Sequence, residues 1–170
     1  DIVIIADFWH GLLSNKVINF ITKNANYLCV NTQLNSANIG FHTISKYHKV
    51  DYVCMHEGEL RHDFRSRYKD VEDLTKSLYN RIEAKLVTVT QGNRGAICFD
   101  SNTKFEHCPA FANKIVDKVG AGDTLYAFTS IAFAIGMPHD IALLLGSLAA
   151  AETIAAISNS KSIDKITIYK

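Results

Sequence analysis

Short apolar runs alternate with helical patterns along the first half of the chain. The runs that we assign to strands cover residues 2–5, 27–30, 52–55 and 86–90. The helical patterns between them cover residues 15–23, 57–67 and 71–84. The first run is continuous and apolar, as expected of a strand buried on both faces of a parallel sheet. The alternation predicts a mostly parallel sheet covered by helices, a three-layer doubly wound α/β fold.

A hairpin pattern follows the fourth strand. Residues 96–100 and 104–107 are strand-like and flank a short polar segment, Ser101-Asn102-Thr103. This segment contains no glycine, so Asn102 would have to take any left-handed position in the turn.

Two long apolar helices are predicted for the last third of the chain. The first covers residues 122–136, with Pro138 just beyond it as a stop signal. The second covers residues 140–158, with Asp140 as its N-cap. No repeat, low-complexity tract or linker interrupts the pattern, so we expect residues 1–170 to form a single domain.

Composition and charge exclude several classes of partner. Of the 170 residues, 48% are hydrophobic and 21% are charged, which is ordinary for a globular domain. The 18 Lys and Arg residues nearly balance the 17 Asp and Glu residues, so nothing in the charge favours nucleic acid or an anionic membrane. The most apolar stretch, residues 125–157, is interrupted at residues 136–140, so neither half is long enough to span a membrane.

The cysteines and histidines show no metal-binding spacing. Cys29, Cys54, Cys98 and Cys108 are far apart, and three of them lie in or beside apolar runs. They are therefore interpreted as small buried hydrophobic residues in a reducing compartment, which predicts a cytoplasmic protein. The seven histidines form no clustered pattern, so we expect surface or core roles for them.

The segment with the clearest chemistry is the turn before the first long helix, residues 116–124. Gly120 and Gly122 flank Ala121, so the backbone can bend tightly and a ligand can approach it closely. Free N–H groups of the turn and the helix dipole favour a phosphate at this point. Asp123 would stand beside that phosphate, where its carboxylate can accept a proton from an attacking hydroxyl. The same residues are also ordinary capping chemistry, so this pattern alone leaves both interpretations open.

In its wider context this turn resembles a family signature. Residues 117–124 are similar to the D-T-x-G-A-G-D motif of the ribokinase/PfkB carbohydrate kinases, with Lys118 in place of the usual threonine. The resemblance implies that Gly120, Ala121 and Gly122 form an anion hole and that Asp123 is the catalytic base. It also implies a ribokinase-like fold, with ATP and Mg²⁺ as cofactors and a small-molecule sugar as the acceptor.

Residues 89–96 are similar to the V-T-x-G-x-x-G element of the same family. The resemblance implies that Thr90, Gly92 and Gly95 border the nucleotide. A glycine turn at the end of a strand is also a common start of a hairpin, and that interpretation stays open. Asn159, after the last helix, is a nucleotide-binding candidate by the same resemblance, although an asparagine there is often just a C-terminal cap.

Residues 56–59 occupy the place of the family's N-x-x-E motif. Glu59 matches the motif, whereas His56 stands where asparagine is expected. The resemblance implies that Glu59 supports magnesium through water. Acids in the first turn of a helix are also favoured by the helix dipole, so a purely structural role remains the alternative.

A run after the first strand resembles the heptose-kinase-like branch of the family. Residues 7–11 are similar to its D-Y-x-x-G run. Gln33, however, stands where the lysine of a D-P-K run is expected, so a phosphate-facing charge is absent.

The resemblance covers the whole chain but only part of a typical family member. Family members usually have about 300 residues, so we expect the N-terminal part and the small β lid to be missing. The isolated chain is then predicted to be inactive as a kinase, and to form a homo-oligomer or pair with the missing part through unpaired strands. The alternatives are a nucleotide-binding or scaffolding module without catalysis, or fusion of the kinase to a nucleotidyltransferase.

Overall fold

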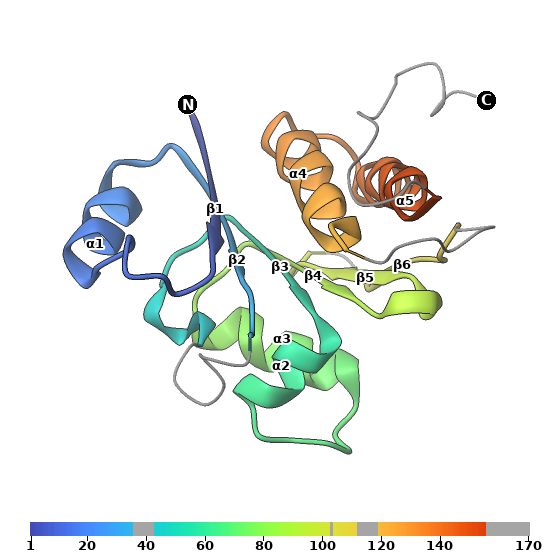
Figure 1. Cartoon of the computed structure of the whole chain (residues 1–170), viewed down its shortest axis with the longest axis horizontal. Coiled ribbons are helices and arrows are strands. Elements are labelled where there is room, and N and C mark those ends of the chain that lie inside the picture. Colours follow the sequence, from blue (N-terminus) through green and yellow to red (C-terminus); the bar gives the residue numbers. More distant parts are fainter. Residues whose placement is uncertain (36–42, 103, 112–118, 156–170) are drawn as a thin grey trace. The chain divides into compact units, whose positions relative to one another are not determined.

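A computed structural model describes residues 1–35, 43–102, 104–111 and 119–155 of the chain (Figure 1). The strands are β1 (Ile2–Asp7), β2 (Tyr27–Thr32), β3 (Tyr52–His56), β4 (Leu86–Thr90), β5 (Ala96–Phe99) and β6 (Glu106–Cys108). The helices are α1 (Asn15–Asn24), α2 (Glu57–Asp63), α3 (Val71–Arg81), α4 (Ala121–Ala134) and α5 (His139–Ala155), with short turns η1 (Ile44–Lys46) and η2 (Gly92–Arg94). The order of strands and helices is the predicted one.

The six strands form one sheet in the order β1-β2-β3-β4-β5-β6. β1 pairs with β2 in parallel along its whole length, from Ile2 opposite Tyr27 to Asp7 opposite Thr32. β2 also pairs with β3 in parallel. Parallel neighbours require a crossover connection, and α1 supplies it between the first two strands. The predicted mostly parallel α/β sheet is therefore confirmed.

The chain divides into two compact units, and each is described by itself. The first comprises residues 1–89 and 98–105, and the second comprises residues 90–97 and 106–170. The expectation of a single domain over residues 1–170 stays a prediction.

The first strand does not match its expected burial. Ile2 and Ile4 are 40% and 41% exposed, whereas Ile5 is buried. β1 is the end strand of the sheet, and its side chains alternate between an exposed and a buried face. The prediction that this run is buried on both faces was wrong, because a continuous apolar run says nothing about whether both faces are covered.

The core of the first unit lies around β2, β3 and β4. Tyr47, Tyr52, Leu60, Leu74 and Leu78 are fully buried there. All four cysteines of the chain are buried as well, as predicted for small hydrophobic residues. The second predicted helix is shorter than expected, because α2 ends at Asp63 instead of continuing to residue 67.

In the second unit, α4 and α5 pack closely against each other. A Cβ added to Gly146 would lie 2.7 Å from the Thr129 methyl group, so this glycine permits the close approach of the two helices. α5 begins at His139, one residue earlier than predicted. Asp140 therefore lies in the first turn instead of at the N-cap, and its carboxylate accepts the N–H of Ile141 at 2.9 Å.

The predicted hairpin strands are present as neighbours β5 and β6, although β6 starts later than expected. Asn102 does not have a positive φ; its N–H donates to the Asp100 carboxylate at 2.8 Å. An aspartate two residues before the amide supplies the turn that a left-handed residue would otherwise make. Among the described residues, no helix is long and apolar enough to cross a membrane.

Candidate functional site

The predicted turn stands at the start of α4. Gly120 has φ 84° and ψ −9° and is the N-cap of the helix, whose first backbone bond joins the Thr124 N–H to the Gly120 carbonyl at 2.9 Å. A left-handed N-cap suits glycine, because other residues meet a Cβ clash there. No side chain caps this helix. Its first N–H groups therefore have to find acceptors outside the helix.

Gly122 leaves this end of α4 open. A Cβ built on Gly122 would meet nothing within 4 Å. Packing among the described residues therefore does not require a glycine here, although glycine in a helix costs up to ~1 kcal/mol relative to alanine. A ligand that approaches the backbone would explain the choice. The start of a helix, with its free N–H groups and its dipole, is a common place for an anion, so the predicted anion hole at Gly120, Ala121 and Gly122 stays a prediction that this local geometry allows.

Asp123 is the acidic residue in the first turn of α4, and its side chain is exposed. The carboxylate is thus accessible from solvent instead of being enclosed in packing. The next residue, Thr124, connects the start of α4 to α5. The hydroxyl groups of Thr124 and Thr153 lie 2.9 Å apart, which ties the start of α4 to the last turns of α5.

The two glycines of the second glycine turn, Gly92 and Gly95, differ in the space around them. Thr90 is the last residue of β4, and Gly92 is the first residue of η2. Gly92 has φ 62°, and a Cβ added to it would meet no atom within 4 Å. Gly95 has φ 90°, and an added Cβ would lie 2.0 Å from the Cys108 carbonyl oxygen. Close contact between two backbone segments is thus sufficient to explain Gly95, whereas Gly92 leaves room for a ligand.

His56 and Glu59 form a capping box at the start of α2. The Gly58 N–H donates to His56 Nδ1 at 3.0 Å, so the histidine does the work that an asparagine oxygen would do at an N-cap. Glu59 accepts the N–H of His56 at 2.7 Å and the N–H of Leu34 at 3.1 Å. Glu59 therefore joins the segment after β2 to the start of α2, which is a structural role in its own right.

Asp7, the last residue of β1, begins the run that resembles the heptose-kinase-like branch, but its burial and its partners were not predicted from the sequence. Asp7 is 3% exposed and accepts hydrogen bonds from the Tyr47 hydroxyl at 2.6 Å and the Trp9 N–H at 2.9 Å. Lys46 forms an ion pair with it at 2.5 Å. Burial by itself would raise the pKa of Asp7, but the hydrogen bonds from Lys46, Tyr47 and Trp9 outweigh burial and hold that pKa below its ordinary value.

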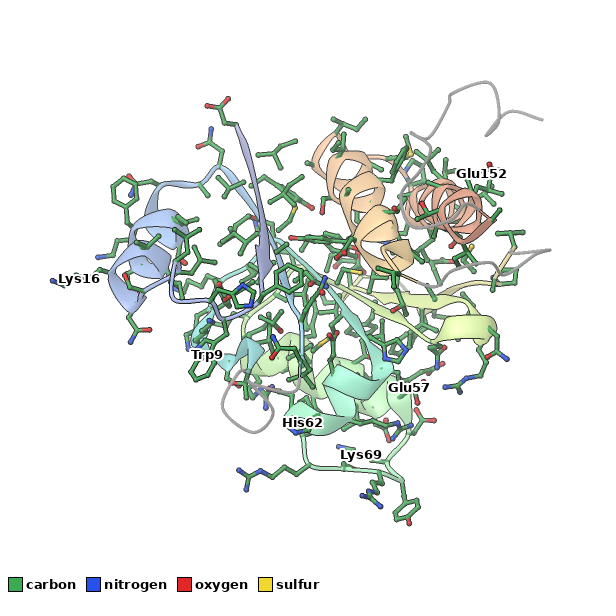
Figure 2. The ribbon with its side chains drawn as sticks, viewed as in Figure 1. Trp9, Lys16, Glu57, His62, Lys69 and Glu152 are labelled. Carbon is green, nitrogen blue, oxygen red and sulfur yellow. The ribbon has the colours of Figure 1, made fainter. Side chains whose placement is uncertain are left out.

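This network fixes an unusual backbone. Trp9 has φ 59°, a left-handed conformation that is rare for a bulky residue, and its side chain is 48% exposed (Figure 2). At the end of the neighbouring strand, Asn31 is buried and donates to the Cys54 carbonyl at 2.8 Å. Open α/β sheets commonly bind ligands beyond the carboxyl ends of their strands, and the network lies at such an end.

Comparison with known proteins decides the family. A family model described as pfkB family carbohydrate kinase matches residues 13–166. The chain belongs to the pfkB family of carbohydrate kinases.

Relatives and solved structures agree with this pfkB assignment. The bifunctional protein HldE of Nitrobacter winogradskyi is 29% identical over 160 residues, covering 91% of this chain and 32% of that protein. Ribokinase from Thermotoga maritima has a TM-score of 0.77 at 22% identity over 99% of this chain and 55% of the other. Arabidopsis thaliana ribokinase, solved with ribose and ATP, has a TM-score of 0.68 at 20% identity, covering 84% of this chain and 46% of the other.

These likenesses confirm a ribokinase-like α/β fold and agree with the heptose-kinase-like branch of the pfkB family. The chain spans about a third of the length of the curated relatives that it matches, 32% in the first case.

Some predicted site residues lie outside the described part of this pfkB chain. The predicted nucleotide-binding residue Asn159 is one of them, and the signature residues Asp117 and Lys118 also lie outside the described residues. Within the described residues, no group of three or more His, Cys, Asp or Glu side chains could hold a metal ion. The roles of Asp123, Gly120, Ala121, Gly122, Thr90, Gly92, Gly95 and Glu59 remain predictions.

The Asp7 network predicts a pH-dependent stability. The Asp7→Asn variant should lose about 2 kcal/mol of unfolding free energy at pH 7, because a charged acceptor for three donors is removed. The folded pKa of Asp7 lies below its ordinary 3.8, so its contribution is present above that value and is lost as the pH falls through the folded pKa. Urea unfolding of both proteins from neutral pH downward measures the difference.

The difference should be constant near neutral pH and shrink in acid. Tyr47→Phe serves as a matched variant, because it removes one of the donors and keeps the carboxylate. A difference between the wild type and Asp7→Asn that stays constant down to about pH 3 would contradict the network as described.

Proposed function

We propose that this chain is the nucleotide-binding and base-bearing part of an ATP-dependent carbohydrate kinase, which transfers a phosphoryl group to a sugar hydroxyl. The observation that carries the proposal is the open start of α4. It combines a left-handed Gly120, an unobstructed Gly122 and an exposed Asp123. Membership in the pfkB family and the likeness to a ribokinase solved with ribose and ATP support it.

In the proposed reaction, the oxygen of a sugar hydroxyl attacks the γ-phosphorus of ATP. A new O–P bond forms while the bond between the γ-phosphorus and the β–γ bridging oxygen breaks, and ADP leaves. The hydroxyl proton passes to the Asp123 carboxylate. The N–H groups of residues 120–122 hold the transferring phosphoryl oxygens, because positioning and charge stabilisation supply most of the rate enhancement in phosphoryl transfer.

Mg²⁺ would neutralise charge on the ATP phosphates when bound. A magnesium ion in such a site would be held mainly by water and by the ATP phosphates, as Mg²⁺ commonly is in kinases. Glu59 would support it through water. Its two oxygens accept the N–H groups of His56 and Leu34, which hold the carboxylate in a fixed position at the start of α2.

The proposed kinase needs a further part for its acceptor. The sheet ends at β1, where Ile2 and Ile4 are exposed, and an apolar end strand favours pairing with another segment. We therefore propose that an N-terminal part, or a second copy, pairs along β1, and that most sugar contacts come from outside this chain. Because ATP is the donor, we place the enzyme in the cytoplasm.

Calorimetry and a turnover assay test the proposal together. We expect the 170-residue chain to bind ATP with Mg²⁺ in calorimetry, and to phosphorylate no sugar of a broad panel at a significant rate. A longer protein that restores the N-terminal part should show ATP-dependent phosphorylation of at least one sugar. Robust turnover by the 170-residue chain would refute the proposal that the sugar contacts come from outside it. Absence of ATP binding by both the chain and the longer protein would refute the kinase proposal.

The alternative is a nucleotide-binding or scaffolding module without catalysis. The observation that favours it is Glu59, whose carboxylate oxygens are both bonded to backbone N–H groups. The replacement of the motif's asparagine by His56 does not favour this alternative, because the His56 side chain still caps α2 by accepting the Gly58 N–H. ATP binding without phosphoryl transfer by the longer protein would support the module.

A further inference from the structure

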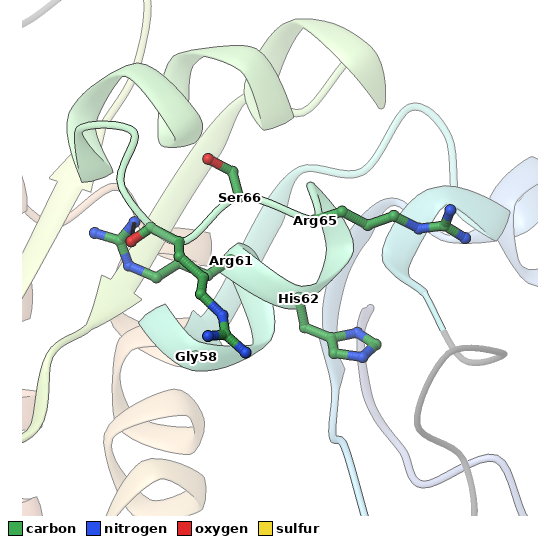
Figure 3. A pocket seen from close by; sticks show the side chains of 6 residues that line it. Gly58, Arg61, His62, Arg65 and Ser66 are labelled. Carbon is green, nitrogen blue, oxygen red and sulfur yellow. Dashed lines mark hydrogen bonds between the residues drawn. The ribbon is translucent and has the colours of Figure 1, made fainter.

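A small hollow on the first unit has an excess of positive charge. It has a volume of about 410 Å³ and is lined by Gly58, Arg61, His62, Arg65, Ser66 and Arg67. Figure 3 shows these residues on α2 and on the loop that follows it. The volume is in the range of small-molecule sites, which are usually 300–1,000 Å³.

The loop after α2 is folded back over the helix by specific bonds. The Arg61 guanidinium pairs with Glu57 at 2.8 Å and donates to the carbonyls of Arg67 and Lys69 at 3.0 and 2.8 Å. These bonds fix the loop that carries Arg65 and Arg67. Arg61 is therefore the residue that organises the hollow, and the cations available to a ligand are on the loop.

The neighbouring acids are already committed to other groups. Glu57 pairs with Arg61, and Asp63 pairs with Arg81. Asp70 accepts the N–H groups of Glu72 and Asp73 as the N-cap of α3. Within the described part of the chain, no hydrogen bond or ion pair is made by the side chains of Arg65 and Arg67. The hollow thus keeps two uncompensated arginines.

Arg65 occupies a position that the backbone would give to glycine. The Ser66 N–H bonds to the Arg61 carbonyl and the Arg65 N–H to the His62 carbonyl, both at 3.0 Å. This is the Schellman pattern of a helix end, in which the residue at Arg65 is left-handed and usually glycine. Arg65 has φ 50°, so a glycine at this position would relieve backbone strain.

We propose that this hollow binds the phosphoryl group of a small phosphorylated molecule. Arginine pairs with phosphate through two parallel N–H···O bonds, and both loop arginines line the hollow. A small molecule fits better than nucleic acid, because the chain has a net charge of only +1 and the basic residues line one confined hollow. The site lies within the first unit and does not depend on Asp123 or on turnover.

Calorimetry on the 170-residue chain tests this, with pyrophosphate, ribose 5-phosphate and ribose as probes at constant ionic strength. Pyrophosphate and ribose 5-phosphate should bind and ribose should not. Stronger binding of pyrophosphate would indicate the diphosphate end of a nucleotide, and stronger binding of ribose 5-phosphate a sugar phosphate. Amide NMR shifts at residues 61–67 locate the binding and separate it from binding at the start of α4.

The Arg65→Gly variant gives opposite effects on binding and stability. Binding of the phosphorylated probes should weaken about tenfold, which corresponds to the loss of one charge-assisted pair. The melting temperature should rise by about 2–4 °C, because glycine relieves the left-handed strain. Lys49→Gly is the matched control, since Lys49 is an exposed cation with φ 56° that does not line the hollow.

Lys49→Gly should raise the melting temperature similarly and leave binding unchanged. Undiminished binding to Arg65→Gly would overturn the proposal, because Arg65 would then not contact the ligand. Equal weakening by Lys49→Gly would overturn it as well, because the loss of any positive charge would then explain the effect. Shifts confined to residues outside 61–67 would overturn it as well. Since none of these measurements uses catalysis, they stand or fall separately from the kinase proposal.

Discussion

Replacing Asp123 by asparagine should lower kcat by about 10³-fold in a protein that includes the N-terminal part. The amide keeps the size of the side chain but cannot accept the hydroxyl proton. ATP binding should be nearly unchanged, because the proposed phosphate contacts come from backbone N–H groups and not from this side chain. Steady-state kinetics with the sugar acceptor and calorimetry with ATP and Mg²⁺ give the two quantities.

Asp140→Asn is the matched control for this variant. Asp123 and Asp140 are both acidic residues in the first turn of an apolar helix, α4 and α5 respectively. If Asp123 only stabilised its helix through the dipole, the two substitutions would have similar small effects on stability and none on turnover. Near-normal kcat in Asp123→Asn would remove the assigned base from the mechanism.

Much of this fold could be predicted because its strands and helices have strong local patterns. The helix at residues 15–23 and the strand at residues 86–90 lie where their periodicity puts them. Helix α4 begins at Ala121 and ends at Ala134, one residue before the predicted start and two before the predicted end, and Pro138 lies beyond it as expected. These signals depend on residues close together in sequence, so no knowledge of the tertiary structure was needed.

What could not be predicted depends on neighbours that are distant in sequence. The exposure of Ile2 and Ile4 follows from the position of β1 at the end of the sheet, which an apolar run does not reveal. The bond between Asp7 and Tyr47 joins residues 40 apart. The early end of α2 was missed because Arg65 takes a left-handed conformation for which the sequence offers no glycine.

Two glycines illustrate what the sequence alone could not distinguish. Gly95 and Gly122 both belong to motifs that resemble family signatures, the first to the nucleotide-bordering element and the second to the predicted anion hole. The structure explains Gly95 by the Cys108 carbonyl that it faces, whereas a Cβ at Gly122 would meet no described atom within 4 Å beyond its chain neighbours and its own helix backbone. Only coordinates separate a glycine required by the protein's own backbone from one that leaves space for something else.

Gly122→Ala should therefore separate stability from function. Helix propensity predicts a gain of up to ~1 kcal/mol in unfolding free energy, because an added methyl group meets no protein atom. The same methyl group would stand where the transferring phosphoryl has to approach the backbone. Loss of one such donor contact typically lowers kcat by about 10²-fold, and we expect a decrease of that size in the longer protein.

Ala127→Gly is the matched control for Gly122→Ala, because Ala127 is an exposed residue in the middle of the same helix. It should lower the unfolding free energy by about 1 kcal/mol and leave kcat unchanged. Urea unfolding and steady-state kinetics on both variants would then give opposite patterns. If Gly122→Ala stabilises the protein while turnover stays normal, the backbone at residue 122 does not contact the transferring group, and the anion hole has to be sought elsewhere.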